Sequence, residues 1–172
     1  MKRKNDVTLS RIGTYVSVFV PAVLSFVNTA VFGIFHPAAL AADHANIKMI
    51  LACVAVLILV PLHEAIHVIG WDMKGGDVKL HFEEMPKRAF VTFEGEMKVS
   101  AYALGTIMPY LVLTVVPVII SILTGNFYLL VFANIHSFGC CSDLVVFLMS
   151  IPHWHKMCKD AERGQTGVVI ID

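Results

Sequence analysis

The chain has 172 residues, of which 57% are apolar and only 15% are Asp, Glu, Lys or Arg. A soluble domain of average composition is about 45–50% apolar and about 25% charged. Thirteen basic and thirteen acidic residues cancel, so the composition excludes a nucleic-acid reader, a collagen and a disordered tail. It predicts an all-α integral membrane protein in which residues 1–172 form a single domain.

Four apolar stretches are long enough to cross a hydrocarbon layer of roughly 30 Å, which takes about 20 helical residues. We therefore expect membrane-spanning helices at residues 15–34, 47–71, 99–123 and 127–151. The basic start, the first apolar stretch and Ala39-Leu40-Ala41 also fit a cleavable signal peptide in part. That stretch is longer than the 7–15 residues usual for a signal peptide, which favours a retained first span.

The basic residues outside these stretches are strongly biased to one side. Cytoplasmic loops carry an excess of Lys and Arg, and only Lys48 of the thirteen basic residues falls on the opposite side. The pattern predicts a multi-pass protein of the cell membrane with both termini in the cytoplasm. The twelve residues on the predicted inner side are Lys2, Arg3, Lys4, Arg11, Lys74, Lys79, Lys87, Arg88, Lys98, Lys156, Lys159 and Arg163.

The loop at residues 72–98 is the one sizeable polar segment. Apolar residues alternate with polar ones over 78–82, and apolar residues recur at every second position over 89–93, after a turn near 84–86. This period of two is typical of half-buried strands, so we predict a small cytoplasmic β-hairpin between the second and third spans. Residues 168–171 fit a short third strand.

The second span contains His63-Glu64-Ala65-Ile66-His67, an HExxH motif. Residues four apart share one face of a helix, so His63 and His67 can direct their imidazoles to one metal ion. Glu64 lies about 100° around the helix, where it fits a general base better than a third ligand. In an apolar span each ionisable group costs roughly 2.5 kcal/mol unless it is paired or solvated. A metal site is therefore favoured over a structural cluster of polar residues.

A catalytic zinc site needs a third protein ligand and one open position. Asp143 is the one acidic residue of the fourth span, and it precedes the inner end of that span by eight residues, as His63 does in the second span. At 1.5 Å per residue both lie about 12 Å below the boundary, so we expect Asp143 to be the third ligand. His136 and Cys140, on the same span, are rival ligands.

Prolines interrupt two of the predicted spans, at Pro61 in the second and at Pro109 and Pro117 in the third. Proline lacks a backbone N–H and kinks a helix. The three residues indicate either ordinary transmembrane prolines or bent helices that admit water to the metal.

These motifs resemble a family of small bacterial and archaeal membrane proteins, the putative zincin peptidases, which are related in plan to the site-2 proteases. The similarity covers about residues 60–164. It rests on the HExxH segment, Met108-Pro109, Asn134 and Ser142-Asp143-Leu144, with Asp160 and Gly164 as weaker matches. In site-2 proteases the aspartate follows a proline and precedes a glycine, and Asp143 has neither neighbour.

The resemblance implies an intramembrane zinc metalloprotease with Zn²⁺ bound by His63, His67 and Asp143, and with Glu64 as the catalytic base. It also implies a substrate contact for Asn134. In this mechanism zinc-activated water attacks a peptide bond of a membrane-associated substrate near the cytoplasmic side. The predicted hairpin offers an edge, at Val91, onto which an extended substrate can pair.

Two other functions fit the same residues. A catalytically silent metal-binding membrane protein would keep the ligands and tolerate the loss of Glu64. A small cation-transport subunit would need polar residues through the outer half of the second span, which is almost purely apolar over 50–60. The expected partners are a membrane protein or peptide substrate and the lipid bilayer, with no nucleic acid. A homo-oligomer or an accessory membrane partner would help to seal a four-span protein.

Overall fold

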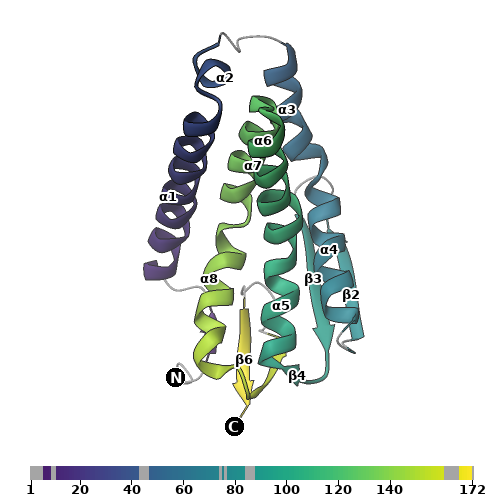
Figure 1. Ribbon diagram of the computed structural model, residues 1–172. Coiled ribbons are helices and arrows are strands. Elements are labelled where there is room, and N and C mark those ends of the chain that lie inside the picture. The colour runs from purple at the N-terminus through teal and green to yellow at the C-terminus, as the bar shows by residue number, and fades with distance from the viewer. Residues whose placement is uncertain are drawn as a thin grey trace.

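The computed structural model describes residues 6–8, 11–42, 47–73, 75, 77–83, 88–160 and 167–171. It is mostly helical, as predicted, and Figure 1 shows a helical bundle with two small sheets at one end. The predicted turn at 84–86, Gly164, Lys2, Arg3 and Lys4 lie outside the described residues.

The helices follow the four predicted apolar stretches closely. They are α1 (Arg11–Phe35), α2 (Pro37–Ala41), α3 (Ile47–Ile58), α4 (Val60–Asp72), α5 (Val99–Tyr110), the π-helical η1 (Leu111–Val115), α6 (Val116–Thr124), α7 (Phe127–Gly139), α8 (Cys141–Ser150) and the 3₁₀-helical η2 (Ile151–His153). Within the described part of the chain, Val18–Phe35 and Val99–Thr124 are each long and apolar enough to cross a membrane. Two bent helix pairs bring this number to four if each pair forms one span.

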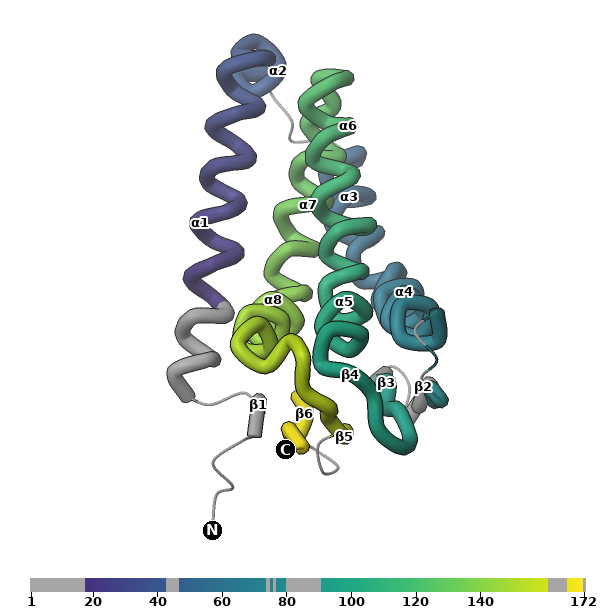
Figure 2. The backbone as a smooth tube through the Cα atoms, turned by 60° about the horizontal axis from the view of Figure 1, so that its bottom comes forward, coloured from purple at the N-terminus to yellow at the C-terminus, as the bar shows by residue number. Residues whose placement is uncertain are grey.

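Both bends fall at defined points of the sequence. The pair α3–α4 bends by 46° and the pair α7–α8 by 59°, and Figure 2 shows α4 and α8 nearly end-on while α6 runs along the bundle. Leu59 separates α3 from α4 just before Pro61, which has no N–H to continue the hydrogen-bond ladder. Cys140 separates α7 from α8. The third span stays one continuous helix despite its prolines, and it accommodates η1 between Pro109 and Pro117.

The predicted hairpin is present as β2 (Asp77–Glu83) and β3 (Arg88–Glu94). The two strands pair antiparallel, with Val78 opposite Phe93 and Leu80 opposite Val91.

A second, four-stranded sheet was not expected from the sequence. Its strands are β1 (Asp6–Thr8), β4 (Met97–Lys98), β5 (Met157–Asp160) and β6 (Gly167–Ile171), in the order β1-β6-β5-β4. The predicted strand at 168–171 therefore exists, but it pairs with β5 and β1 rather than with the hairpin. Every strand of this sheet has two to five residues, too few to give a recognisable alternation in sequence.

The main core joins the sheets to the helices. Trp71, Phe93, Met97, Tyr102 and Cys158 are buried together there, from α4, β3, β4, α5 and β5. Away from this core, large apolar side chains face outward: Phe26, Leu57 and Leu123 are each more than 70% exposed. Exposed apolar surface of this kind is typical of proteins that contact a membrane or another protein.

Candidate metal centre

The HExxH segment lies at the start of α4, immediately after the first bend. His63 follows the break at Leu59 by one helical turn, and its backbone N–H donates to the Leu59 carbonyl at 2.9 Å. His67 lies one turn further along the same face and is buried, whereas Glu64 is half-buried. The predicted helical placement of the motif is therefore present.

Asp143 lies in the first turn of α8, immediately after the second bend. A carboxylate is favoured at this position because the N-terminal end of a helix carries partial positive charge. Its Oδ1 accepts a 3.5 Å hydrogen bond from Ser142 Oγ. Its Oδ2 is buried and makes no well-formed hydrogen bond within the described residues. The two helix breaks thus present His63 and Asp143 at corresponding positions on different helices.

The three predicted ligands converge on one point. His63 Nε2 lies 3.2 Å from His67 Nε2 and 3.2 Å from Asp143 Oδ2, and His67 Nε2 lies 3.5 Å from that oxygen. Zinc bonds of about 2.1 Å at a tetrahedral centre place the ligand atoms about 3.4 Å apart. The donor set and its spacing therefore fit one face of a zinc tetrahedron. A zinc ion there would give the buried Oδ2 atom of Asp143 a partner in place of the hydrogen bond that it lacks.

His67 is held by a second layer of contacts. Its Nδ1 donates to the Gly105 carbonyl of α5 at 3.0 Å, which leaves the Nε2 lone pair for a metal. Its ring stacks on Trp71 at 5.5 Å between centroids, and Trp71 stacks in turn on Tyr102 at 5.2 Å. Trp71 also donates its indole N–H to the Tyr102 carbonyl at 2.8 Å. No motif marks Trp71 as a contact of His67, although it follows His67 by four residues on the same helix face.

The rival ligands lie on the far side of His63. His136 Nε2 is 3.4 Å from His63 Nδ1, and Cys140 Sγ is 3.8 Å from the same nitrogen. Thr114 of η1 contacts His136 Nδ1 at 2.9 Å. His136 and Cys140 therefore do not join the face formed by the Nε2 atoms and Asp143, and they form a separate group with His63.

Glu64, the remaining acid of the motif, lies near the three converging side chains. The Glu64 carboxylate is close enough to interact electrostatically with His63, His67 and Asp143. It is absent from both groups of side chains whose donor atoms converge among the described residues. Glu64 thus lies beside the three converging ligands without being one of them.

The two predicted substrate contacts lie elsewhere. Asn134 of α7 faces α1, where its side chain accepts from Asn28 at 3.1 Å and donates to Thr29 at 3.2 Å. Both partners are more than 100 residues away in sequence, so no local pattern indicates these contacts. Val91 lies in the middle of β3, half-buried against the main core.

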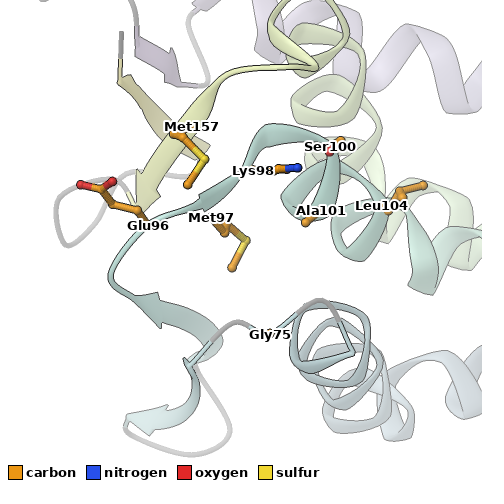
Figure 3. A pocket seen from close by; sticks show the side chains of 8 residues that line it. All are labelled: Gly75, Glu96, Met97, Lys98, Ser100, Ala101, Leu104 and Met157. Atoms are coloured by element: carbon orange, nitrogen blue, oxygen red, sulfur yellow. The ribbon is translucent and has the colours of Figure 1, made fainter.

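A pocket of about 430 Å³ opens beside β4 and the first turns of α5. Figure 3 shows Met97, Leu104 and Met157 around it, with Lys98 and Glu96 among the other lining residues.

Cys158 lies in the adjacent strand β5, where burial and the nearby Asp160 carboxylate raise the pKa of its thiol to about 12. The thiol of Cys158 is thus an inert part of the core rather than a nucleophile.

The fold and the converging side chains define a helical protein with a candidate His-His-carboxylate metal centre. A sequence model of the family described as "Putative zincin peptidase" matches residues 56–153, more than half of the chain. The chain belongs to this family. No curated protein and no solved structure matches it. Family membership supports metallopeptidase activity and implies zinc as the metal.

Proposed function

We propose that this protein is an intramembrane zinc metallopeptidase that hydrolyses peptide bonds of membrane-associated substrates near the cytoplasmic side. The observation that carries the proposal is the triangle of His63 Nε2, His67 Nε2 and Asp143 Oδ2, with sides of 3.2 to 3.5 Å. It lies on two bent apolar helix pairs in a member of a zincin family. Ionisable groups in such helices are costly unless they serve a site.

His63, His67 and Asp143 would hold the metal and leave one position for water or substrate. Zinc bound there supplies Lewis acidity, which polarises the scissile carbonyl and makes a water molecule more acidic. The side chains of His63 and Asp143 each keep 13% of their surface exposed, although the Oδ2 atom of Asp143 is itself buried.

Glu64 performs the proton transfers. Its carboxylate takes a proton from the attacking water, whose oxygen bonds to the carbonyl carbon of the substrate. The C–N bond then breaks, and Glu64 returns the proton to the leaving amine nitrogen. The products are a free carboxylate and a free amine, and Glu64 is restored.

Several features support a four-span topology with both termini in the cytoplasm. The apolar lengths allow four spans if each bent pair is one span. β1 near the start of the chain pairs with β6 near its end, and Figure 1 places both sheets at one end of the bundle. In the sequence, all but one of the basic residues lie before the first apolar stretch, between the second and third, or after the fourth. Reporter fusions at the two ends of the chain test this topology directly.

The substrate in this proposal is an extended segment of a membrane protein or peptide. A helical segment must unwind before cleavage, because its carbonyls are otherwise hydrogen-bonded and inaccessible. The edge of the hairpin at Val91 offers backbone groups for such a segment. A homo-oligomer or an accessory membrane protein is a further proposed partner, and it would shield a site built from so few spans.

The first experiment measures zinc per chain in detergent-purified wild type, His67→Ala, Asp143→Ala and Glu64→Gln. Near-stoichiometric zinc is expected in wild type and Glu64→Gln, with at least a tenfold loss of affinity in the other two variants. Each preparation is then reconstituted in liposomes with a panel of single-span reporter proteins. Cleavage by wild type and none by Glu64→Gln is the expected result.

The controls separate the alternatives. Glu64→Gln is nearly isosteric, so retained zinc shows that the site is intact. Cleavage at the wild-type rate by zinc-loaded Glu64→Gln would overturn the mechanism. Wild type that binds zinc but cleaves no reporter would favour the catalytically silent metal-binding protein. Absence of zinc from wild type would leave the three residues as a structural or ion-pathway cluster.

A further inference from the structure

His63 has a second set of neighbours that the proposed peptidase site does not use. Its Nδ1 faces His136 Nε2 at 3.4 Å and Cys140 Sγ at 3.8 Å, and Cys140 Sγ lies 3.9 Å from His136 Nε2. We propose that these three atoms form a second metal site, which binds a thiophilic divalent cation and shares His63 with the peptidase site.

The bend at the end of α7 creates this group. Cys140 follows the last residue of α7, one turn beyond His136, and its thiol lies near His136 and His63. Cys140 is 0% exposed and His136 is 4% exposed, so neither side chain is solvated. His136 and Cys140 are thus buried polar groups next to a third, His63, in apolar helices. Burying such groups costs free energy, which packing alone does not explain.

The orientation of His136 suits metal binding. Thr114 Oγ1 lies 2.9 Å from His136 Nδ1, and when this hydroxyl accepts a hydrogen bond from Nδ1–H the lone pair of the ring is on Nε2. That lone pair then faces His63 Nδ1 at 3.4 Å, whereas Cys140 Sγ lies beside the ring, 3.5 Å from Nδ1 and 3.9 Å from Nε2, so the Cys140 side chain must turn to reach an ion on Nε2. Thr114 comes from η1, where the π-helical turn widens the third span. The third span thus fixes the ring without taking up its ligand atom.

The spacing fits a tetrahedral ion with one sulfur and two nitrogen ligands. Zinc bonds of about 2.1 Å to nitrogen and about 2.3 Å to sulfur place two nitrogens about 3.4 Å apart and a nitrogen and sulfur about 3.6 Å apart. The observed nitrogen pair is at 3.4 Å, and the sulfur distances are slightly longer at 3.8 and 3.9 Å. A thiolate ligand selects soft cations, and Cd²⁺, which is larger than Zn²⁺, suits the wider sulfur spacing. Cys140 gives up its thiol proton to solvent when it binds the ion.

Sharing His63 makes the two sites compete. A neutral imidazole has one lone pair and one N–H, so His63 can serve one site through Nε2 or the other through Nδ1. A cation at the second site therefore withdraws His63 from the peptidase ligands. This consequence rests on the proposed function, whereas the existence of the second site does not. The second site would act as an inhibitory metal site.

The test is a titration of metal-free, detergent-purified protein with Cd²⁺, followed by the ultraviolet charge-transfer absorption of a cadmium–thiolate bond. An Asp143→Asn background weakens the peptidase site and leaves the second group complete. In this background the band is expected at one Cd²⁺ per chain. Cys140→Ser should abolish the band, and His136→Gln should weaken Cd²⁺ binding at least tenfold. Cys141→Ser is the matched control, since this half-buried neighbour lies outside the group and should keep the band.

A band that survives Cys140→Ser, or that Cys141→Ser removes equally, would overturn the proposal. If Cys140→Ser fails to fold, the His136→Gln result decides in its place, and unchanged Cd²⁺ affinity in that variant rejects the site. The competition is tested with zinc-loaded wild type, in which each Cd²⁺ bound should release one zinc ion. Simultaneous binding of both ions would refute the sharing of His63. Failure of the peptidase proposal would appear in the Glu64→Gln cleavage assay and would leave these readouts unchanged.

Discussion

Gly70 and Gly105 bring α4 and α5 almost into backbone contact, because a Cβ atom on Gly70 would lie 2.7 Å from the Cα of Gly105. Small residues allow this approach between apolar helices. It brings the Gly105 carbonyl within 3.0 Å of His67 Nδ1 and seats Trp71 directly over Gly105. The orientation of one proposed metal ligand thus depends on two residues without side chains.

Gly105→Ala is expected to destabilise the protein and to weaken zinc binding. The added Cβ would lie 2.0 Å from Trp71 Cδ1, so the indole or the helix must shift, and such overpacking costs about 1–3 kcal/mol. Gly139→Ala is the control, because its Cβ meets no atom within 4 Å. Thermal unfolding in detergent and zinc affinity measure both effects. Equal behaviour of the two variants would show that the helix contact is looser than described.

Trp71→Phe is expected to lower zinc affinity by up to about tenfold while leaving the fold intact. The substitution removes the N–H donor to the Tyr102 carbonyl and shrinks the surface on which His67 stacks. Residues that orient a metal ligand typically affect affinity by about 10–100-fold. Trp154→Phe, in the turn after η2, changes the same residue type away from the site and should leave affinity unchanged. A matching loss in both variants would point to general destabilisation.

The convergence of His63, His67 and Asp143 could be predicted from residue positions along the second and fourth spans. The HExxH spacing predicts that His63 and His67 share a face, and equal distances from the inner ends of two spans predict that Asp143 lies at the same depth. The structure brings these three side chains together. Their role as zinc ligands remains a prediction.

Contacts between segments distant in sequence could not be predicted in the same way. The pair α7–α8 bends by 59° although no proline marks Cys140, and α8 packs against α5 and α1, which are distant in sequence. The four-stranded sheet joins β1 near the start of the chain, and β5 and β6 near its end, to the short strand β4 near its middle. The family resemblance implies a substrate contact for Asn134, which stays a prediction, and nothing in the sequence indicates its hydrogen bonds to Asn28 and Thr29 of α1. In each case the interaction is set by tertiary packing rather than by local periodicity.

Asn134→Ala is expected to loosen the docking of α1 and to leave zinc binding unchanged. Asn134 hydrogen-bonds Asn28 and Thr29 across the helix interface, and such bonds within membrane proteins average about 0.6 kcal/mol. Asn28→Ala should cause a similar loss, and the double variant should lose less than the sum of the two, because both remove the same bond. Unfolding in detergent gives the three free energies. Fully additive losses would show that the two side chains do not interact.

Val91→Pro is expected to slow cleavage of a reporter at least tenfold with little change in zinc per chain. The backbone N–H of Phe93 donates to Asp160 Oδ2 at 3.4 Å rather than to β2. Since N–H groups alternate sides along a strand, the N–H of Val91 also points away from β2, and that of Thr92 points toward it. Proline at Val91 therefore removes a donor from the outer edge and spares the hairpin ladder.

Thr92→Pro is the matched control, because it removes a donor from the ladder between β2 and β3 and should destabilise the hairpin itself. The two variants are compared by cleavage rate, zinc per chain and thermal unfolding. If the outer edge of β3 pairs with the substrate, Val91→Pro loses cleavage while its unfolding stays near wild type. A Val91→Pro protein that unfolds early and loses zinc in step with cleavage would assign Val91 to the core and not to substrate binding.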